Sequence, residues 1–191
     1  DHDVLKEMKV MGKGGLVAHP AAQANGRNSR ELILSGGNWT LQRASEVAGS
    51  GEDISQPGFE TGDWITATVP GTVVSSYHNV GALPDPNYAD NQLNISESFF
   101  WSNFWYRNEF EVPAEFKGEH VFLNFDGINW KANVYLNGQS VGRIEGAFKR
   151  GIFDVTSQIV KGKNVLAVEI VRNSHIGAIK EKNKQSTDYN G

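Results

Sequence analysis

Two polar segments of the chain carry the side chains best suited to contact a ligand. Residues 83–91 and residues 173–191 are long connections, and long connections inside a domain are uncommon and often functional. Their carboxylates and amides match the donors and acceptors of sugar hydroxyl groups, yet the same short polar residues build ordinary turns. Both interpretations stay open at this point. The candidate contacts are Asp85, Asn91, Asp188 and Asn190.

Other catalytic chemistries have weaker support. The chain has no Cys, and its one Gly-x-Ser-x-Gly match, at residues 138–142, lies at the predicted hairpin turn and not at a strand-to-helix elbow, so nucleophilic catalysis is not predicted. The five His residues are never paired at the spacing of metal ligands, and we predict neither a metal nor a cofactor. Glycosidases need two carboxylates flanking a bond, but spacing alone selects no pair here. The acids considered are Asp85, Asp90, Asp126, Glu145 and Asp154.

Six aromatic residues crowd into eight positions between residues 99 and 106. Flat rings pack against the apolar face of a sugar, so the cluster is a candidate stacking surface. Aromatic residues also fill the core and rim of β-sandwiches, where each buries about 150–250 Å², and this interpretation carries more weight. The residues are Phe99, Phe100, Trp101, Phe104, Trp105 and Tyr106.

Composition narrows the class of protein. The chain has 191 residues, of which 39% are hydrophobic, and a net charge of −4; this length suits one domain with an ordinary core. The acidic balance predicts no nucleic-acid partner, and the apolar runs are too short to cross a membrane. The absence of Cys excludes disulfides. It suits a periplasmic or secreted protein and leaves a cytoplasmic location open as well.

The elements that must position these side chains are mostly strands. Apolar residues alternate with polar ones over 105–112, 121–125, 132–136 and 166–171, and period two predicts half-buried strands with the charged face solvated. Asn137-Gly138 predicts a type I′ turn and a tight hairpin.

One short helix is expected at 72–80, where Thr72 can cap the N-terminus and Gly81 can end the helix. Seven or eight short strands without βαβ alternation predict an all-β sandwich. We expect residues 1–29 to be a tail or linker, residues 30–173 the sandwich, and residues 174–191 a C-terminal loop leading to downstream domains.

Short sequence blocks along the chain occur in a specific order. They include VPGTV at 69–73, GALPDP at 81–86, WYR at 105–107, LNFDGI at 123–128, ANVYLNG at 132–138 and TDYNG at 187–191. Taken together, the blocks resemble the N-terminal domain of glycoside hydrolase family 2, nearest to its β-mannosidase and exo-β-glucosaminidase branch.

The resemblance implies a jelly-roll sandwich of the galactose-binding type. Family members retain anomeric configuration through two Glu residues on a downstream (β/α)8 barrel, behind an immunoglobulin-like domain. A barrel needs about 250 residues, so we expect no catalytic residue here and no hydrolysis by this chain alone.

In the family, the jelly-roll domain packs on the barrel, and two of its loops close the pocket for the terminal sugar of an oligosaccharide. The resemblance therefore assigns sugar contacts to Asp85, Asn91, Asp188 and Asn190, and implies exo specificity. Two interpretations compete with this accessory role in a β-mannosidase, exo-β-glucosaminidase or β-galactosidase. They are a free-standing carbohydrate-binding module and a protein-interaction sandwich with no sugar affinity. Within the accessory role, the alternative is that the two loops only make contacts between domains.

Overall fold

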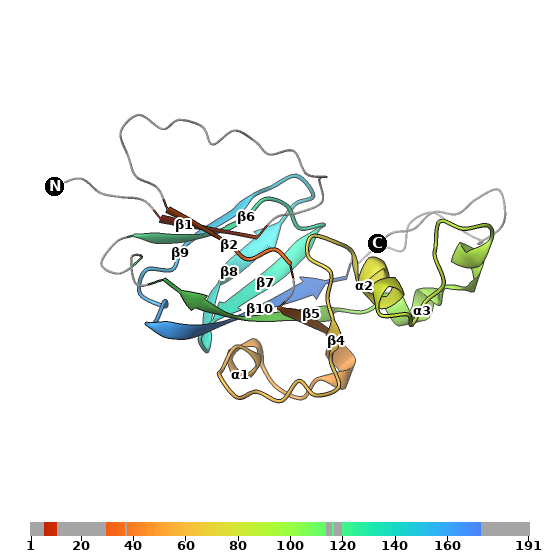
Figure 1. The fold of residues 1–191 in the computed structure, drawn as a ribbon, viewed down its shortest axis with the longest axis horizontal. Coiled ribbons are helices and arrows are strands. Elements are labelled where there is room, and N and C mark those ends of the chain that lie inside the picture. The colour runs from red at the N-terminus through yellow and green to blue at the C-terminus, as the bar shows by residue number, and fades with distance from the viewer. Residues whose placement is uncertain (1–5, 11–29, 37, 114–115, 117–119, 173–191) are drawn as a thin grey trace.

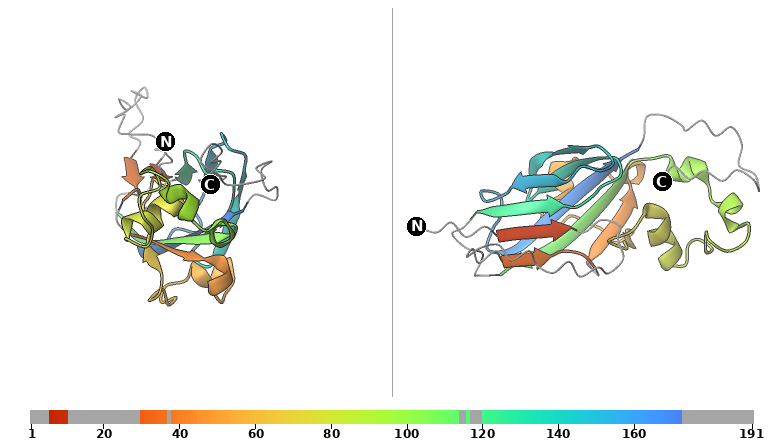
Figure 2. Two further views of the ribbon diagram at one scale, coloured as in Figure 1. Left: turned by 90° about the vertical axis from the view of Figure 1, so that its right-hand side faces the viewer. Right: turned by 90° about the horizontal axis from the view of Figure 1, so that it is seen from above.

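The structure is a computed structural model that describes residues 6–10, 30–36, 38–113, 116 and 120–172. Its strands form two stacked sheets (Figures 1 and 2). The four-stranded sheet has the order β2-β1-β6-β9, with β1 (Lys6–Val10), β2 (Arg30–Ile33), β6 (Val121–Phe125) and β9 (Gly151–Asp154). The six-stranded sheet has the order β4-β3-β5-β10-β7-β8, with β3 (Trp39–Arg43), β4 (Ile65–Thr66), β5 (Phe104–Val112), β7 (Lys131–Leu136), β8 (Gln139–Glu145) and β10 (Gly162–Val171). This is the expected all-β sandwich.

The hydrophobic core lies between the two sheets, because each strand turns its alternate apolar residues inward. In β6 and β7 buried residues alternate strictly with partly exposed ones, as period-two patterning requires. Leu123 of the four-stranded sheet and Val134 and Leu166 of the six-stranded sheet are fully buried in this cluster. The predicted alternation in these strands is confirmed.

The turn between β7 and β8 is the one that the sequence predicts. Asn137 has a φ of 51° and Gly138 a φ of 79°, the two positive values of a type I′ turn. The hairpin closes directly, with Leu136 opposite Gln139. The Asn137 side chain also accepts a hydrogen bond from the backbone nitrogen of Val165 at 2.8 Å, which ties the turn to β10.

The expected helix is present as α2 (Val73–Asn79), capped by reciprocal hydrogen bonds between Thr72 and Ser75. The expectation of a single helix was too low. The described residues also form α1 (Gly51–Ile54), α3 (Glu97–Phe100) and the 3₁₀ turns η1 (Ala44–Glu46) and η2 (Asn91–Asn94). Each has three or four residues, too few for a helical period to show in the sequence.

The N-terminal segment corrects a second expectation. Instead of lying in a tail, Lys6–Val10 forms β1, between β2 and β6 and parallel to both. The sequence predicted no parallel pairing. A five-residue strand gives a weak periodic signal, and its hydrogen-bond partners come from distant parts of the chain, so tertiary pairing decides its conformation. The other residues of the expected tail lie outside the described ones.

The outer face of β5 corrects a third expectation, since its charged residues were predicted to be solvated. Arg107 is only 5% exposed, and Trp105 is buried with Ile54 and Ala167 in a second apolar cluster. The segment that contains α1 lies over this face (Figure 1). Arg107 donates from Nε to the carbonyl of Ile54 at 2.9 Å and from Nη2 to the carbonyl of Gln56 at 3.0 Å. The buried guanidinium therefore holds the covering segment in place.

Candidate functional site

The candidate loop between α2 and α3 is braced from inside by two of its own polar residues. Asp85 accepts a hydrogen bond at its Oδ1 from the backbone nitrogen of Asn87 at 2.8 Å, an arrangement typical of an Asx turn. Asn91 donates from Nδ2 to the backbone carbonyl of Asp85 at 2.9 Å. The structure thus brings Asp85 and Asn91 together. Asp188 and Asn190, the other two predicted contacts, lie outside the described residues.

This loop is held against the end of the sandwich by aromatic packing on both of its flanks. Tyr77 of α2 meets Phe99 and Phe100 of α3 edge-on, with ring centres 5.2 and 5.6 Å apart. The two phenylalanines also lie 6.2 Å from the ring of Phe104 at the start of β5. On the opposite side, the Arg43 guanidinium lies over the Phe99 ring at 5.1 Å. The helices that carry the loop are therefore fixed to the core.

The aromatic cluster consequently divides between two roles. Phe104, Trp105 and Tyr106 are buried, and Phe99 and Phe100 pack against the core. Burial raises the pKa of the Tyr106 hydroxyl well above its usual value, so this group stays neutral. Packing therefore accounts for five of the six residues. Trp101, at the end of α3, instead lines a surface pocket.

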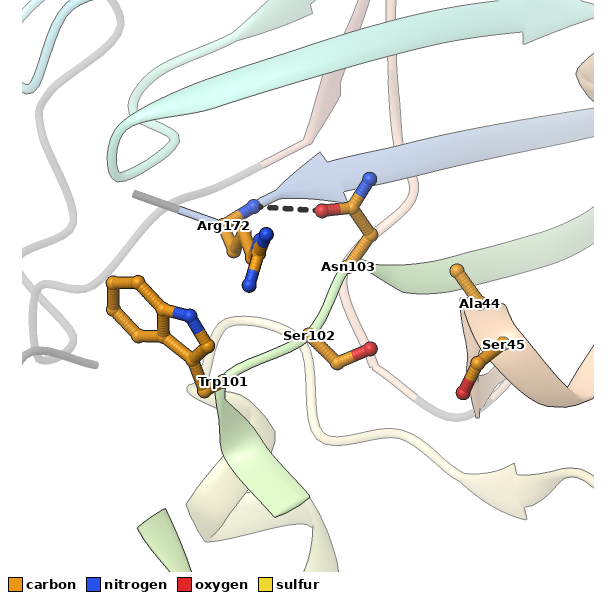
Figure 3. Close-up of a pocket in the computed structure, with 6 residues that line it drawn as sticks. All are labelled: Ala44, Ser45, Trp101, Ser102, Asn103 and Arg172. Atoms are coloured by element: carbon orange, nitrogen blue, oxygen red, sulfur yellow. Dashed lines mark hydrogen bonds between the residues drawn. The ribbon is translucent and has the colours of Figure 1, made fainter. Parts of the chain in front are cut away.

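That pocket lies where three distant segments meet, next to the end of α3 (Figure 3). Arg172, which follows β10, places its guanidinium 5.4 Å from the centre of the Trp101 ring and donates its backbone nitrogen to Asn103 Oδ1 at 3.0 Å. These contacts join the end of β10 to the segment that follows α3. The lining residues are Ala44, Ser45, Trp101, Ser102, Asn103 and Arg172.

A carboxylate beside the pocket is fully engaged by two amides. Glu169 of β10 accepts from Asn103 Nδ2 at its Oε1 at 2.7 Å and from Asn133 Nδ2 at its Oε2 at 2.8 Å. The network links β7 and β10 to Asn103, the residue just before β5, which lines the pocket. Sequence reasoning missed Asn103, Glu169 and Arg172 as site residues. The one available signal was the single acid of β10, which lies among apolar residues, but its partners follow only from strand register.

Glu145 and Asp154, two further acids considered for catalysis, are bound by a cation and by a neighbouring threonine. Lys131 forms an ion pair with Glu145 at 2.9 Å, and its hydrogen bond, followed by its charge, lowers the pKa of that carboxyl. Hydrogen bonds from Thr156 lower the pKa of Asp154. A general acid in glycoside cleavage needs a raised pKa instead, so these two groups are unsuited to that role. Within the described ranges there is no group of three or more metal-ligating side chains, and no helix there is long and apolar enough to cross a membrane.

Fold and loop arrangement agree with a family match. The model of the glycosyl hydrolase 2 galactose-binding domain-like family matches residues 39–190, and the chain belongs to this family. The chain corresponds to a non-catalytic domain of its glycosidases.

Individual relatives place the chain more closely. It is 33% identical over 168 residues to the mannosylglycoprotein endo-β-mannosidase of Lilium longiflorum, covering 84% of this chain and 17% of that protein. It is 30% identical to the exo-β-D-glucosaminidase of Streptomyces avermitilis, covering 71% of this chain and 15% of that protein. The crystal structure of the Amycolatopsis orientalis exo-chitosanase CsxA matches with a TM-score of 0.66 and 28% identity, over 72% of this chain and 16% of that one. The predicted β-mannosidase and exo-β-glucosaminidase branch is confirmed, and the chain spans about a sixth of these relatives.

Proposed function

We propose that this chain forms one wall of the terminal-sugar pocket of a larger retaining glycosidase, of the β-mannosidase, exo-β-glucosaminidase or β-galactosidase type. The observation that carries the proposal is the family match over residues 39–190. The two catalytic Glu residues then lie on a (β/α)8 barrel of the same polypeptide, which follows an immunoglobulin-like domain. The sandwich packs on that barrel, and the reaction itself needs no residue of this chain.

The braced loop supports a direct role in holding sugar. Because Asn91 fixes the backbone at Asp85, the loop presents its polar groups without first having to order itself. In the proposal, Asp188 and Asn190 complete the site from the C-terminal segment. A carboxylate that accepts hydrogen bonds from the hydroxyls of the terminal sugar leaves no room in the pocket for a further sugar unit. The enzyme then cleaves only at the ends of oligosaccharides. The lily relative is named an endo-enzyme, so exo specificity is the part of the proposal most in need of a test.

The test uses the longer polypeptide that contains this chain. Asp188→Ala and Asn91→Ala should each lower kcat/KM for a β-mannoside or β-glucosaminide. The decrease should correspond to a loss of about 1–3 kcal/mol of transition-state stabilisation, the cost of losing a hydrogen bond to a sugar hydroxyl. Asn124→Ala, on β6 in the four-stranded sheet, is the matched control and should leave kcat/KM unchanged. Unaltered kinetics in the first two variants would show that the two loops make contacts between domains and do not bind the sugar.

The Trp101 pocket favours one alternative, a free-standing carbohydrate-binding module. Titration of mannose, glucosamine or galactose into the 191-residue chain distinguishes this module from a pocket wall of a larger enzyme. Binding no tighter than millimolar fits a pocket wall, whereas a micromolar Kd fits an independent module. The proposal includes a periplasmic or secreted location, which fractionation of the source cells tests.

A further inference from the structure

The pocket at the end of α3 shares no residue with the loop of Asp85 and Asn91 and is a separate place for a ligand. Its sides come from η1, from the segment after α3 and from the residue that follows β10 (Figure 3). The core fixes the segment after α3, since Phe104 follows directly after Asn103 and is 2% exposed. The backbone nitrogens of Ala44 and Arg172 both donate to Asn103, at 2.9 and 3.0 Å, and so join the other two segments to it. A pocket whose walls are set in this way does not have to form when the ligand arrives.

Arg172 differs from the other arginines whose side chains the structure describes. The other four arginines whose side chains the structure describes each lie within 4.0 Å of a carboxylate: Arg43 with Glu46, Arg107 with Glu109, Arg143 with Glu145 and Arg150 with Asp126. Arg172 contacts the Trp101 ring instead, and no carboxylate of the described residues pairs with it. A guanidinium beside an aromatic ring keeps its in-plane N–H donors for another acceptor.

The remaining polar groups of the pocket make it rich in donors. The Asn103 amide donates from its nitrogen to Glu169 and accepts at its oxygen from the backbone nitrogen of Arg172. Glu169 itself binds two amides and does not line the pocket. The lining then offers the Arg172 guanidinium and the hydroxyls of Ser45 and Ser102, with no carboxylate among them. Such a set suits an anionic ligand and disfavours an amino sugar.

We propose that this pocket binds a sugar unit that bears a carboxylate, a hexuronic acid. Arg172 binds the carboxylate through two parallel N–H donors, the hydroxyls of Ser45 and Ser102 bond to ring hydroxyls, and the sugar ring lies beside Trp101. The preference for a sugar over an acidic peptide rests on the proposed carbohydrate role of the domain. The anionic preference stands on the pocket alone.

The test is a titration of the 191-residue chain, followed by NMR at the indole N–H of Trp101. Methyl β-D-glucuronide should bind with a millimolar Kd, and methyl β-D-glucoside, which differs only at C6, at least about tenfold more weakly, the least that a lost charge-assisted hydrogen bond costs. Binding should weaken as salt is raised. Arg172→Gln should weaken glucuronide binding by the same factor. Arg143→Gln, which changes an exposed arginine on β8, should not.

Three outcomes would overturn the proposal. Equal affinity for glucoside and glucuronide would show that the carboxylate is not recognised. Equal affinity for acetate or N-acetylglutamate would show that the sugar ring is not recognised. Chemical-shift changes confined to residues 85–91 would show that the ligand binds at the loop of Asp85 and Asn91 and not in the Trp101 pocket. None of these results bears on Asn91→Ala or Asp188→Ala in the longer polypeptide, so failure here is distinguishable from failure of the proposed function. Unchanged melting of Arg172→Gln verifies that the variant is folded.

Discussion

Replacing Arg107 by Met should destabilise the domain strongly, although Arg107 is one of several surface-like charges in a strand. The side chain is 5% exposed and binds the carbonyls of Ile54 and Gln56 and, at 2.7 Å, the carboxylate of Glu109. Ile54 is fully buried, so its carbonyl is left without a donor at a cost of about 1–3 kcal/mol. The ion pair with the partly exposed Glu109 adds no more than about 1 kcal/mol. The sum is about 1–4 kcal/mol, which lowers Tm by roughly 2–16 °C for a domain of this size.

Urea unfolding followed by tryptophan fluorescence measures this loss, and amide hydrogen exchange over residues 44–56 locates it. Exchange should accelerate there first, because the guanidinium holds that segment on the sheet. Arg143→Met is the matched control: its exposed ion pair with Glu145, at 3.4 Å, is worth under about 1 kcal/mol. If the two variants unfold at the same urea concentration, the assigned role of Arg107 is refuted.

Two further predictions concern the turn between β7 and β8 and the dependence of folding stability on acidic pH. Gly138→Ala should cost about 1–2 kcal/mol of folding stability, because φ is 79° and an added Cβ would clash with the side chain of Gln56. Gly62→Ala, where an added Cβ meets open space, should be neutral in the same melting assay. Hydrogen bonds from Lys163 and Arg107 lower the pKa of Glu109 below 4.5, so its stabilising contribution is complete above that pH and is lost as pH falls through the lowered pKa. Glu109→Gln should therefore be less stable than the wild type at neutral pH, and the difference should shrink below pH 4.5; a difference independent of pH would contradict the assignment.

The candidate site was only partly accessible from the sequence. Loop composition pointed to Asp85 and Asn91, and the structure joins them by a hydrogen bond. Their role with sugar stays a prediction, as do those of Asp188 and Asn190. The Trp101 pocket could not be predicted, since its residues come from segments near 44, 101 and 172. No local pattern encodes which strand ends become neighbours.

Local chemistry by itself determined the strands β5, β6, β7 and β10, the hairpin and α2. Alternation at period two, positive φ at Asn137 and Gly138, and the hydroxyl cap of Thr72 each act within a few residues. Tertiary structure alone decided that Lys6–Val10 pairs in parallel with β2 and β6, and that Arg107 is covered by α1. Those outcomes depend on hydrogen bonds and burial between segments far apart in the chain, whose energies exist only once the two sheets have assembled.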